Sequence, residues 1–218
     1  MNNLKQIFYS LDKVSDKWTS YFDVYERHLG SFQNTQPYVL EIGVQRGGSV
    51  DMWLEYFGQG TTVLGVDIDP ACKQLQYPPN VEIAIGDQAS AVFWQQTLAN
   101  RPLFDVIVDD GGHTMTQQIV SLECLWSHLK PGGVYVCEDT HTSYWPDWGG
   151  GFDHPRSFQT YAKRLTDLLN RQHIARGMIN QRLIEIFGTS LTGVYFYNSQ
   201  VVLEKGTVQP FERVFSRE

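Results

Sequence analysis

The sequence has no long hydrophobic run and no sign of a secretion signal. A transmembrane helix needs about 18 or more consecutive apolar residues, and no segment of the 218 residues provides them. Residues 1–12 also lack the basic start and apolar core that a secretory signal peptide would have. We therefore expect a soluble, cytoplasmic protein that has no membrane partner.

Basic residues are fewer than acidic ones. The chain has 17 Lys and Arg against 24 Asp and Glu, which gives a formal net charge of -7 at pH 7. Proteins that bind the nucleic-acid backbone or an anionic membrane surface rely on basic patches, and no cluster of Lys or Arg is present. Nucleic acid is therefore not an expected partner.

Cysteine is scarce as well. Cys72, Cys124 and Cys137 lie far apart, and none forms a CxxC pair. This spacing disfavours a disulfide framework and a structural zinc site, which needs clustered soft ligands. We expect three reduced and mostly buried thiols.

Short apolar runs alternate with helical patterns from residue 37 onwards. The runs are YVLEIG (38–43), TVLGVDID (62–69), VEIAIGD (81–87), FDVIVDD (104–110) and VYVCED (134–139). Helical patterns follow at 49–57, at 89–99, from 114 to a stop at KPGG (130–133), and at 156–171. This alternation is typical of a parallel sheet with helices on both faces. Three later runs, RLIEIFG, GVYFYNS and VVLEK, leave no room for crossover helices and are expected to pair antiparallel at one sheet edge.

The first part of the chain has a different pattern. Residues 4–29 carry apolar side chains at spacings of three and four, which is the period of an amphipathic helix, and we expect this helix in two pieces. The length of 218 residues suits one domain with an appendage. We therefore expect an N-terminal helical segment, residues 1–36, that serves as a lid or an oligomer contact, and a main domain at 37–218.

Glycines and carboxylates follow the first run, where ligands bind in open α/β sheets. The turn reads EIGVQRGGS (41–49). A dinucleotide-binding fingerprint would have a glycine where Gln45 stands, so NAD is disfavoured. The looser turn and Glu41 suit a ligand that carries its own carboxylate and ammonium group. The candidate cofactor-binding residues in this turn are Glu41, Gly43, Gly47 and Ser49.

Aspartates end the second and third runs. Asp67 can accept both hydroxyls of a ribose through its two oxygens, and Asp87, after Gly86, can lie beside an adenine. With the first turn, this ordered set predicts an S-adenosylmethionine (SAM) site. The fold expected is the Rossmann-like class I methyltransferase fold, a seven-stranded and mostly parallel sheet with an antiparallel C-terminal edge. The alternative is that the glycines only pack and the aspartates only cap helices.

Four carboxylates follow the fourth and fifth runs. Asp109, Asp110, Glu138 and Asp139 would repel one another and raise each other's pKa if they converged without a partner. A divalent cation would remove this cost, and oxygen ligands select Mg²⁺, with Mn²⁺ or Ca²⁺ as alternatives. Because side chains alternate along a strand, all four cannot point to one place. We expect Asp110, Glu138 and Asp139 to bind the metal, and Asp109 to face the cofactor.

His113 stands one residue before Thr114, which forms a capping-box pattern with Gln117. The positive end of a helix disfavours the imidazolium, so we expect His113 to be neutral at pH 7 and free to take a proton. It is the predicted general base, and the alternative is an ordinary packing histidine.

The loop after the fifth run is polar and rich in glycine and aromatic residues. His141 either orients the substrate or is solvated. Tyr144, Trp145 and Trp148 either stack on a sugar ring or fold over one another. These four residues are the predicted substrate contacts.

The acidic motifs resemble a known family. DDGGHT (109–114) followed by EDTHTSYWP (138–146) looks like the metal-dependent sugar O-methyltransferases of macrolide biosynthesis, and SDKWTSYFDVYERHL (15–29) is similar to their N-terminal lead-in. The similarity runs from about residue 15 to 150. It implies Mg²⁺ held by Asp110, Glu138 and Asp139, with two adjacent substrate hydroxyls, and His113 as the base. Those enzymes form tetramers and carry an extra N-terminal domain, for which 218 residues leave no room, and we expect a homo-oligomer.

The predicted function is SAM-dependent O-methylation, assisted by Mg²⁺, of a hydroxyl on a sugar or glycosylated natural product. One rival is a metal-dependent hydroxylase or hydrolase, since His113, His141 and Asp110 could supply the two histidines and one carboxylate of a non-haem iron oxygenase. The other rival is a binding protein that has kept the fold without catalysis.

Overall fold

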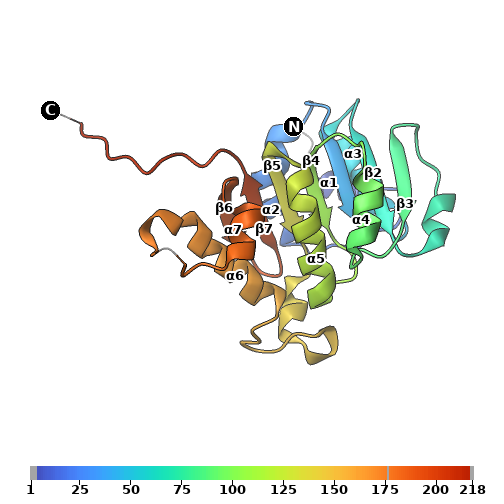
Figure 1. The fold of residues 1–218 in the computed structure, drawn as a ribbon. Helices are drawn as coiled ribbons and strands as arrows, with labels where there is room; N and C mark the ends of the chain where they lie inside the picture. The colour runs from blue at the N-terminus through green and yellow to red at the C-terminus, as the bar shows by residue number, and fades with distance from the viewer. Residues whose placement is uncertain (1–3, 176, 217–218) are drawn as a thin grey trace.

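A seven-stranded sheet forms the centre of the computed structural model, which describes residues 4–175 and 177–216 (Figure 1). The strands are β1 (Tyr38–Ile42), β2 (Thr62–Asp67), β3 (Val81–Ile85), β4 (Phe104–Asp109), β5 (Leu129–Cys137), β6 (Leu191–Phe196) and β7 (Val201–Lys205). Their order is β3-β2-β1-β4-β5-β7-β6. Strands β1 to β5 pair in parallel, whereas β7 runs antiparallel to both β5 and β6. This confirms the mostly parallel sheet with an antiparallel C-terminal edge.

Helices cover both faces of the sheet. On one face, α1 (Leu4–Ser10), α2 (Tyr21–Leu29) and α3 (Gly48–Phe57) share a core cluster with Val39 and Val108. On the other face, α4 (Ala91–Leu98), α5 (Met115–Leu125), α6 (Phe158–Leu169) and α7 (Gln181–Phe187) pack around Leu40 and Ile107. Figure 1 shows α4 and α5 in front of the strands. Because both faces are covered, the central strands are mostly apolar rather than alternating.

The N-terminal segment forms two short helices, as the spacing of its apolar residues predicts. The connection between α1 and α2 runs against the start of α3. The backbone N–H of Gly48 donates to the carbonyl of Val14 at 3.2 Å, and a side chain at Gly48 would collide with the carbonyls of Lys13 and Val14 at 2.7 Å. The segment therefore lies beside the turn that follows β1. A domain boundary at residue 36 and an oligomer contact stay predictions.

Side chains set the start of α5. The hydroxyl of Thr114 accepts from the backbone N–H of Gln117 at 3.4 Å, and the Gln117 amide oxygen accepts from the backbone N–H of Thr114 at 3.1 Å. This is the predicted capping box. Because Thr114 provides the cap, the residues from Asp109 to His113 do not serve that purpose.

One predicted strand is wrong. The run RLIEIFG lies in helix α7 and does not join the sheet edge. The amide oxygen of Asn180 caps this helix by accepting from the backbone N–H of Arg182 at 2.9 Å, and Leu183 and Phe187, four residues apart, are buried. Four of its seven residues are apolar, and a short apolar run of this kind fits a buried strand as well as a buried helix segment.

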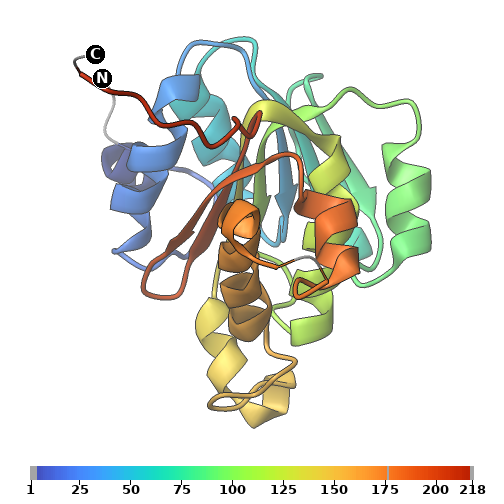
Figure 2. The same ribbon diagram turned by 60° about the vertical axis from the view of Figure 1, so that its left-hand side comes forward.

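The predicted end of the fifth helix is also corrected. Helix α5 ends at Leu125, and a short 3-10 turn at Trp126–His128 follows. KPGG (130–133) does not stop a helix but lies inside β5, next to an irregular register between β4 and β5. The loop after β5 contains two further 3-10 turns, η4 (Thr140–Tyr144) and η5 (Pro146–Trp148), and Figure 2 shows this yellow segment projecting below the sheet together with α6.

The strand order reverses between β1 and β4, which is where open α/β sheets bind ligands. Each of three strands is extended by one more backbone bond at its carboxyl end. Gly43 donates to the carbonyl of Val66 at 2.8 Å, Asp110 to that of Ile42 at 3.0 Å, and Glu138 to that of Asp109 at 2.9 Å. The glycine turn and both acidic motifs are therefore level with one another. Among the described residues, no helix is long and apolar enough to span a bilayer.

Candidate active site

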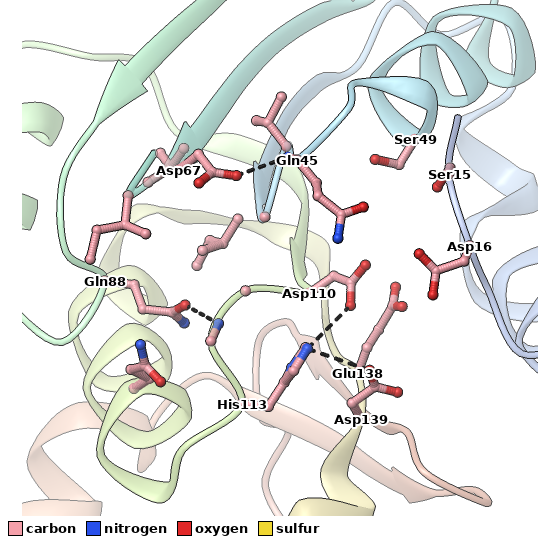
Figure 3. A pocket seen from close by; sticks show the side chains of 18 of the residues that line it. Ser15, Asp16, Gln45, Ser49, Asp67, Gln88, Asp110, His113, Glu138 and Asp139 are labelled. Atoms are coloured by element: carbon pink, nitrogen blue, oxygen red, sulfur yellow. Dashed lines mark hydrogen bonds and ion pairs between the residues drawn. The ribbon is translucent and has the colours of Figure 1, made fainter. Parts of the chain in front are cut away.

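A cavity of about 610 Å³ opens beyond the carboxyl ends of the parallel strands (Figure 3). This volume is in the usual range of small-molecule sites. Among the residues predicted from sequence, its walls include Gly43, Ser49, Asp67, Asp87, Asp110, His113, Glu138, Asp139 and His141. Figure 3 shows Ser49 and Asp67 on one side of the space and His113 with the acidic residues on the other. The cavity therefore joins the predicted cofactor site to the predicted metal site.

Asp67 is held by two backbone amides. Its carboxylate accepts from the N–H of Gln45 at 2.8 Å and from that of Asp69 at 2.9 Å, one bond on each oxygen. A carboxylate oxygen has two lone pairs, so both oxygens can still accept from a ligand. Gln45 itself has a φ of 49°, which is uncommon for a residue other than glycine. The turn after β1 and Asp67 thus fix one another at the rim of the cavity.

The backbone conformation and the close neighbours of Gly43 and Gly47 both require glycine at these positions. Gly43 has a φ of 94°, and a Cβ there would lie 1.9 Å from the carbonyl oxygen of Asp110. Gly47 has a φ of 88°, and a Cβ there would lie 2.2 Å from the hydroxyl of Tyr77. Gly43 lines the cavity, but Gly47 does not. Gly47 therefore packs against Tyr77, and its contact with a cofactor stays a prediction.

Glu41 and Asp109 also lie outside the cavity lining. Glu41 is completely buried, and this burial raises its pKa to about 7. Asp109 accepts from the side-chain amide of Gln88 and from the hydroxyl of Tyr135, both at 2.9 Å, on the opposite face of β4. The alternation along the strand that turns Asp110 into the cavity turns Asp109 away from it. Neither residue lines the cavity, and their contacts with a cofactor stay predictions.

Asp110, His113 and Asp139 form a compact group. Nε2 of His113 lies 3.4 Å from Oδ2 of Asp139 and 3.9 Å from Oδ1 of Asp110 (Figure 3). Each of the three residues offers an atom within 4.8 Å of those of the other two. Two hard carboxylates beside an imidazole suit Mg²⁺ or Mn²⁺.

Glu138 faces the cavity, but both of its oxygens have partners from the N-terminal segment. Oε1 accepts from the hydroxyl of Tyr25, and Oε2 accepts from Nζ of Lys17 at 2.9 Å. The Lys17 ammonium, with its side chain 1% exposed, also pairs with Asp110. Burial alone would lower the pKa of Lys17, but Asp110 and Glu138 raise it well above its usual value. Lys17 is therefore a permanent positive charge within the acidic cluster.

Negative charge still exceeds positive charge here. The single ammonium of Lys17 faces Asp110, Glu138 and, at longer range, Glu41, while Asp139 lies on the other side of His113. Burial is the main cause that raises the pKa of Glu138, to about 8. A divalent cation among these carboxylates would relieve that cost. The donor set thus fits a bound metal ion.

His113 is held in a strained backbone conformation. Its φ is 55°, and that of Asp139, which it faces, is 51°. Such positions cost about 1–3 kcal/mol each and concentrate at functional sites. Burial lowers the pKa of His113, against the opposing effect of Asp110 and Asp139. The direction agrees with the predicted neutral imidazole, although burial rather than the helix end is the main cause.

The structure places the four predicted substrate contacts in different surroundings. His141 lines the cavity, and its ring lies 4.6 Å from that of Trp145 and 6.2 Å from that of Trp18. Tyr144 and Trp145 are 46% and 48% exposed and do not line the cavity. Trp148 lines a neighbouring cavity of about 650 Å³, and its ring lies 6.0 Å from that of His113. Of the four, only His141 is therefore placed at the cavity wall.

Sequence reasoning missed the contribution of the N-terminal segment. Lys17, Tyr21 and Tyr25 all touch the acidic cluster, but the sequence places them only in a stretch that resembles the family's lead-in and assigns them no contact at the site. Their spacing of four residues, with a polar group on each side chain, suggests a common side of the segment but does not indicate which residues they contact.

Comparison with known proteins agrees with this geometry. Residues 40–140 match a family described as a methyltransferase domain. The mycinamicin VI 2''-O-methyltransferase of Micromonospora griseorubida is 32% identical over 190 residues, covering 84% of this chain and 47% of that protein. A rhamnosyl tetracenomycin-C 2'-O-methyltransferase of Streptomyces olivaceus is 36% identical over 166 residues, covering 72% of this chain and 43% of that protein. The chain thus spans about half the length of these relatives.

A solved structure also matches nearly all of this chain over about half of its own length. The MycE methyltransferase of the mycinamycin pathway, in complex with Mg, S-adenosylhomocysteine and mycinamycin VI, superimposes with a TM-score of 0.80. It is 27% identical and covers 94% of this chain, which in turn covers 54% of it.

Proposed function

We propose that this chain, which has the class I methyltransferase fold and resembles the metal-dependent sugar O-methyltransferases of macrolide biosynthesis, methylates a hydroxyl of a glycosylated small molecule. One observation carries the proposal. A single cavity joins the turn after β1 and Asp67 to the acidic group around His113. A methyl donor and an acceptor hydroxyl could therefore meet within it.

The methyl donor we propose is SAM, which supplies a methyl group on a positively charged sulfur. Asp67 would bind the ribose hydroxyls through the lone pairs that the backbone amides leave free. Gly43, Ser49 and Asp87 would line the rest of this half of the cavity. The chain residues thereby hold the donor at the switch point between β1 and β4.

The metal we propose is Mg²⁺, which Mn²⁺ can replace. Asp110 and Asp139 would hold it, and Glu138 could join them through lone pairs that Lys17 and Tyr25 do not use. When bound, Mg²⁺ lowers the pKa of a coordinated alcohol and fixes its direction.

His113 would act as the general base. Its Nε2 lies between Asp110 and Asp139, where the acceptor hydroxyl would be bound. As the hydroxyl oxygen forms its bond to the methyl carbon, the carbon–sulfur bond breaks and its electron pair stays on sulfur. The hydroxyl proton passes to Nε2, so the products are a methyl ether, S-adenosylhomocysteine and a protonated His113.

The acceptor class rests on the relatives. The Streptomyces olivaceus relative is named as an O-methyltransferase of a rhamnosyl tetracenomycin, and the Micromonospora griseorubida relative as an O-methyltransferase of mycinamicin VI. His141, with Trp18 and Trp145 beside it, could contact a sugar ring at the mouth of the cavity. A homo-oligomeric assembly stays a prediction.

Calorimetry with SAM tests the cofactor assignment. Because hydrogen bonds to a charged group contribute about 1.5–3 kcal/mol, Asp67→Ala should weaken binding by about 10- to 150-fold. Asp69→Ala is the matched control, since Asp69 accepts from the N–H of Ala71 at 2.8 Å and does not line the cavity. Absence of SAM binding by the unaltered protein, with and without Mg²⁺, would refute the proposal.

A further inference from the structure

The acidic cluster has a second layer of contacts from the N-terminal segment. Lys17 lies in the connection before α2, and Tyr21 and Tyr25 lie one helical turn apart within α2. A spacing of four residues places side chains on one face of a helix. Lys17 binds Asp110 and Glu138, Tyr21 binds Asp139, and Tyr25 binds Glu138. One face of this segment thus contacts all three predicted metal ligands.

These contacts divide the carboxylate oxygens into two sets. Oδ2 of Asp110 accepts from Lys17, whereas Oδ1 is the oxygen nearest His113, at 3.9 Å. Oδ1 of Asp139 accepts from the hydroxyl of Tyr21 at 2.6 Å, whereas Oδ2 is the oxygen nearest His113, at 3.4 Å. The N-terminal segment therefore holds one oxygen of each aspartate and leaves the other turned toward the centre of the site.

The tyrosine rings and their hydroxyls have separate functions. The ring of Tyr25 packs edge-on against Trp53 at 5.2 Å and against Tyr21 at 6.2 Å, which anchors α2 in the core. The hydroxyls extend beyond this apolar packing. That of Tyr21 also contacts Oγ of Ser199 at 2.9 Å, in the turn between β6 and β7. A phenylalanine would keep the ring packing and remove only the hydrogen bonds of the hydroxyl, which at Tyr21 join Asp139 and Ser199 and at Tyr25 join Glu138.

We propose that Tyr21 and Tyr25 are positioning residues that orient Asp139 and Glu138 for the divalent cation and so set the metal affinity of the site. This inference rests on the proposed function, because the metal is part of it. Groups that hydrogen-bond to metal ligands fix the ligands' direction, and losing one typically lowers metal affinity about 10- to 100-fold. The N-terminal segment then contributes to metal binding as well as packing beside the site.

Mn²⁺ binding, measured by electron paramagnetic resonance on the full chain, tests this. Tyr21→Phe and Tyr25→Phe should each weaken Mn²⁺ binding about 10- to 100-fold, with an altered spectrum of the bound ion. SAM affinity should not change, because neither hydroxyl contacts the residues of the cofactor half. The matched control is Tyr161→Phe, which removes a hydroxyl that donates to Glu123 at 2.9 Å, on α5 and outside the active-site cavity.

Ser199→Ala is a second variant that tests the positioning role, and it leaves both tyrosines in place. It removes a partner of the Tyr21 hydroxyl and should weaken Mn²⁺ binding in the same direction by a smaller factor. If the unaltered protein binds Mn²⁺ and the two phenylalanine variants bind it equally well, the positioning role is overturned and the proposed function stands. If the unaltered protein binds no Mn²⁺, both the positioning role and the metal part of the proposed function are overturned.

Discussion

Replacing His113 by alanine is expected to lower kcat for methyl transfer by about 10²- to 10⁴-fold, the usual contribution of a general base. The imidazole lies between Asp110 and Asp139, and burial lowers its pKa, which favours the neutral form that accepts the hydroxyl proton. SAM affinity should not change, because Asp67 and the turn after β1 are untouched. Single-turnover rates with labelled SAM, together with calorimetry, measure the two quantities separately.

His128→Ala is the matched control for this variant. His128 precedes β5, whereas the active site lies beyond the other end of that strand. The control should methylate at the normal rate. A His113→Ala variant with near-normal kcat would contradict the assignment of the base.

Replacing Lys17 by methionine is expected to destabilise the metal-free protein by about 3–5 kcal/mol, the usual cost of removing one partner of a buried ion pair. Lys17 has a side chain that is only 1% exposed and pairs with both Asp110 and Glu138. Without it, these carboxylates would lose their buried cation. Denaturant unfolding in EDTA measures the loss.

Lys13→Met is the matched control, from the same connection between α1 and α2. Lys13 pairs with Asp51 at 3.0 Å, but its side chain is 25% exposed, and such a pair contributes about 0–1 kcal/mol. Adding Mg²⁺ should restore more stability to Lys17→Met than to the unaltered protein, because a ligand stabilises the folded state that binds it. If Lys17→Met loses no more unfolding free energy than Lys13→Met, the buried ion pairs of Lys17 do not stabilise the site.

The sheet and the position of the site could be predicted because they depend on local patterns. Apolar runs separated by helical stretches specify parallel strands, and the residues just after β1, β2 and β4 then meet at one edge. Alternation along β4 also bears on which of the two neighbouring aspartates faces the cavity, and the structure places Asp110 there. The run at 182–188 forms a helix rather than the predicted strand, because a short apolar run by itself does not distinguish the two.

Contacts between distant parts of the chain could not be predicted from such local patterns. Nothing near Glu138 in the sequence indicates that Lys17 and Tyr25 bind its two oxygens, since the partners are more than 100 residues apart. The packing of Gly47 against Tyr77 likewise depends on how two loops approach each other. Residue types thus located the site, whereas the tertiary packing determined which atoms face it.

The most direct test of the proposed activity is methyl transfer from labelled SAM to a panel of rhamnosylated and other glycosylated natural products, run with Mg²⁺ and again in excess EDTA. The predicted result is label in a sugar methyl ether with Mg²⁺, no transfer in EDTA, and recovery when Mg²⁺ is added back. Transfer at the full rate in EDTA, or label appearing on an atom other than a hydroxyl oxygen, would contradict a metal-assisted sugar O-methyltransferase.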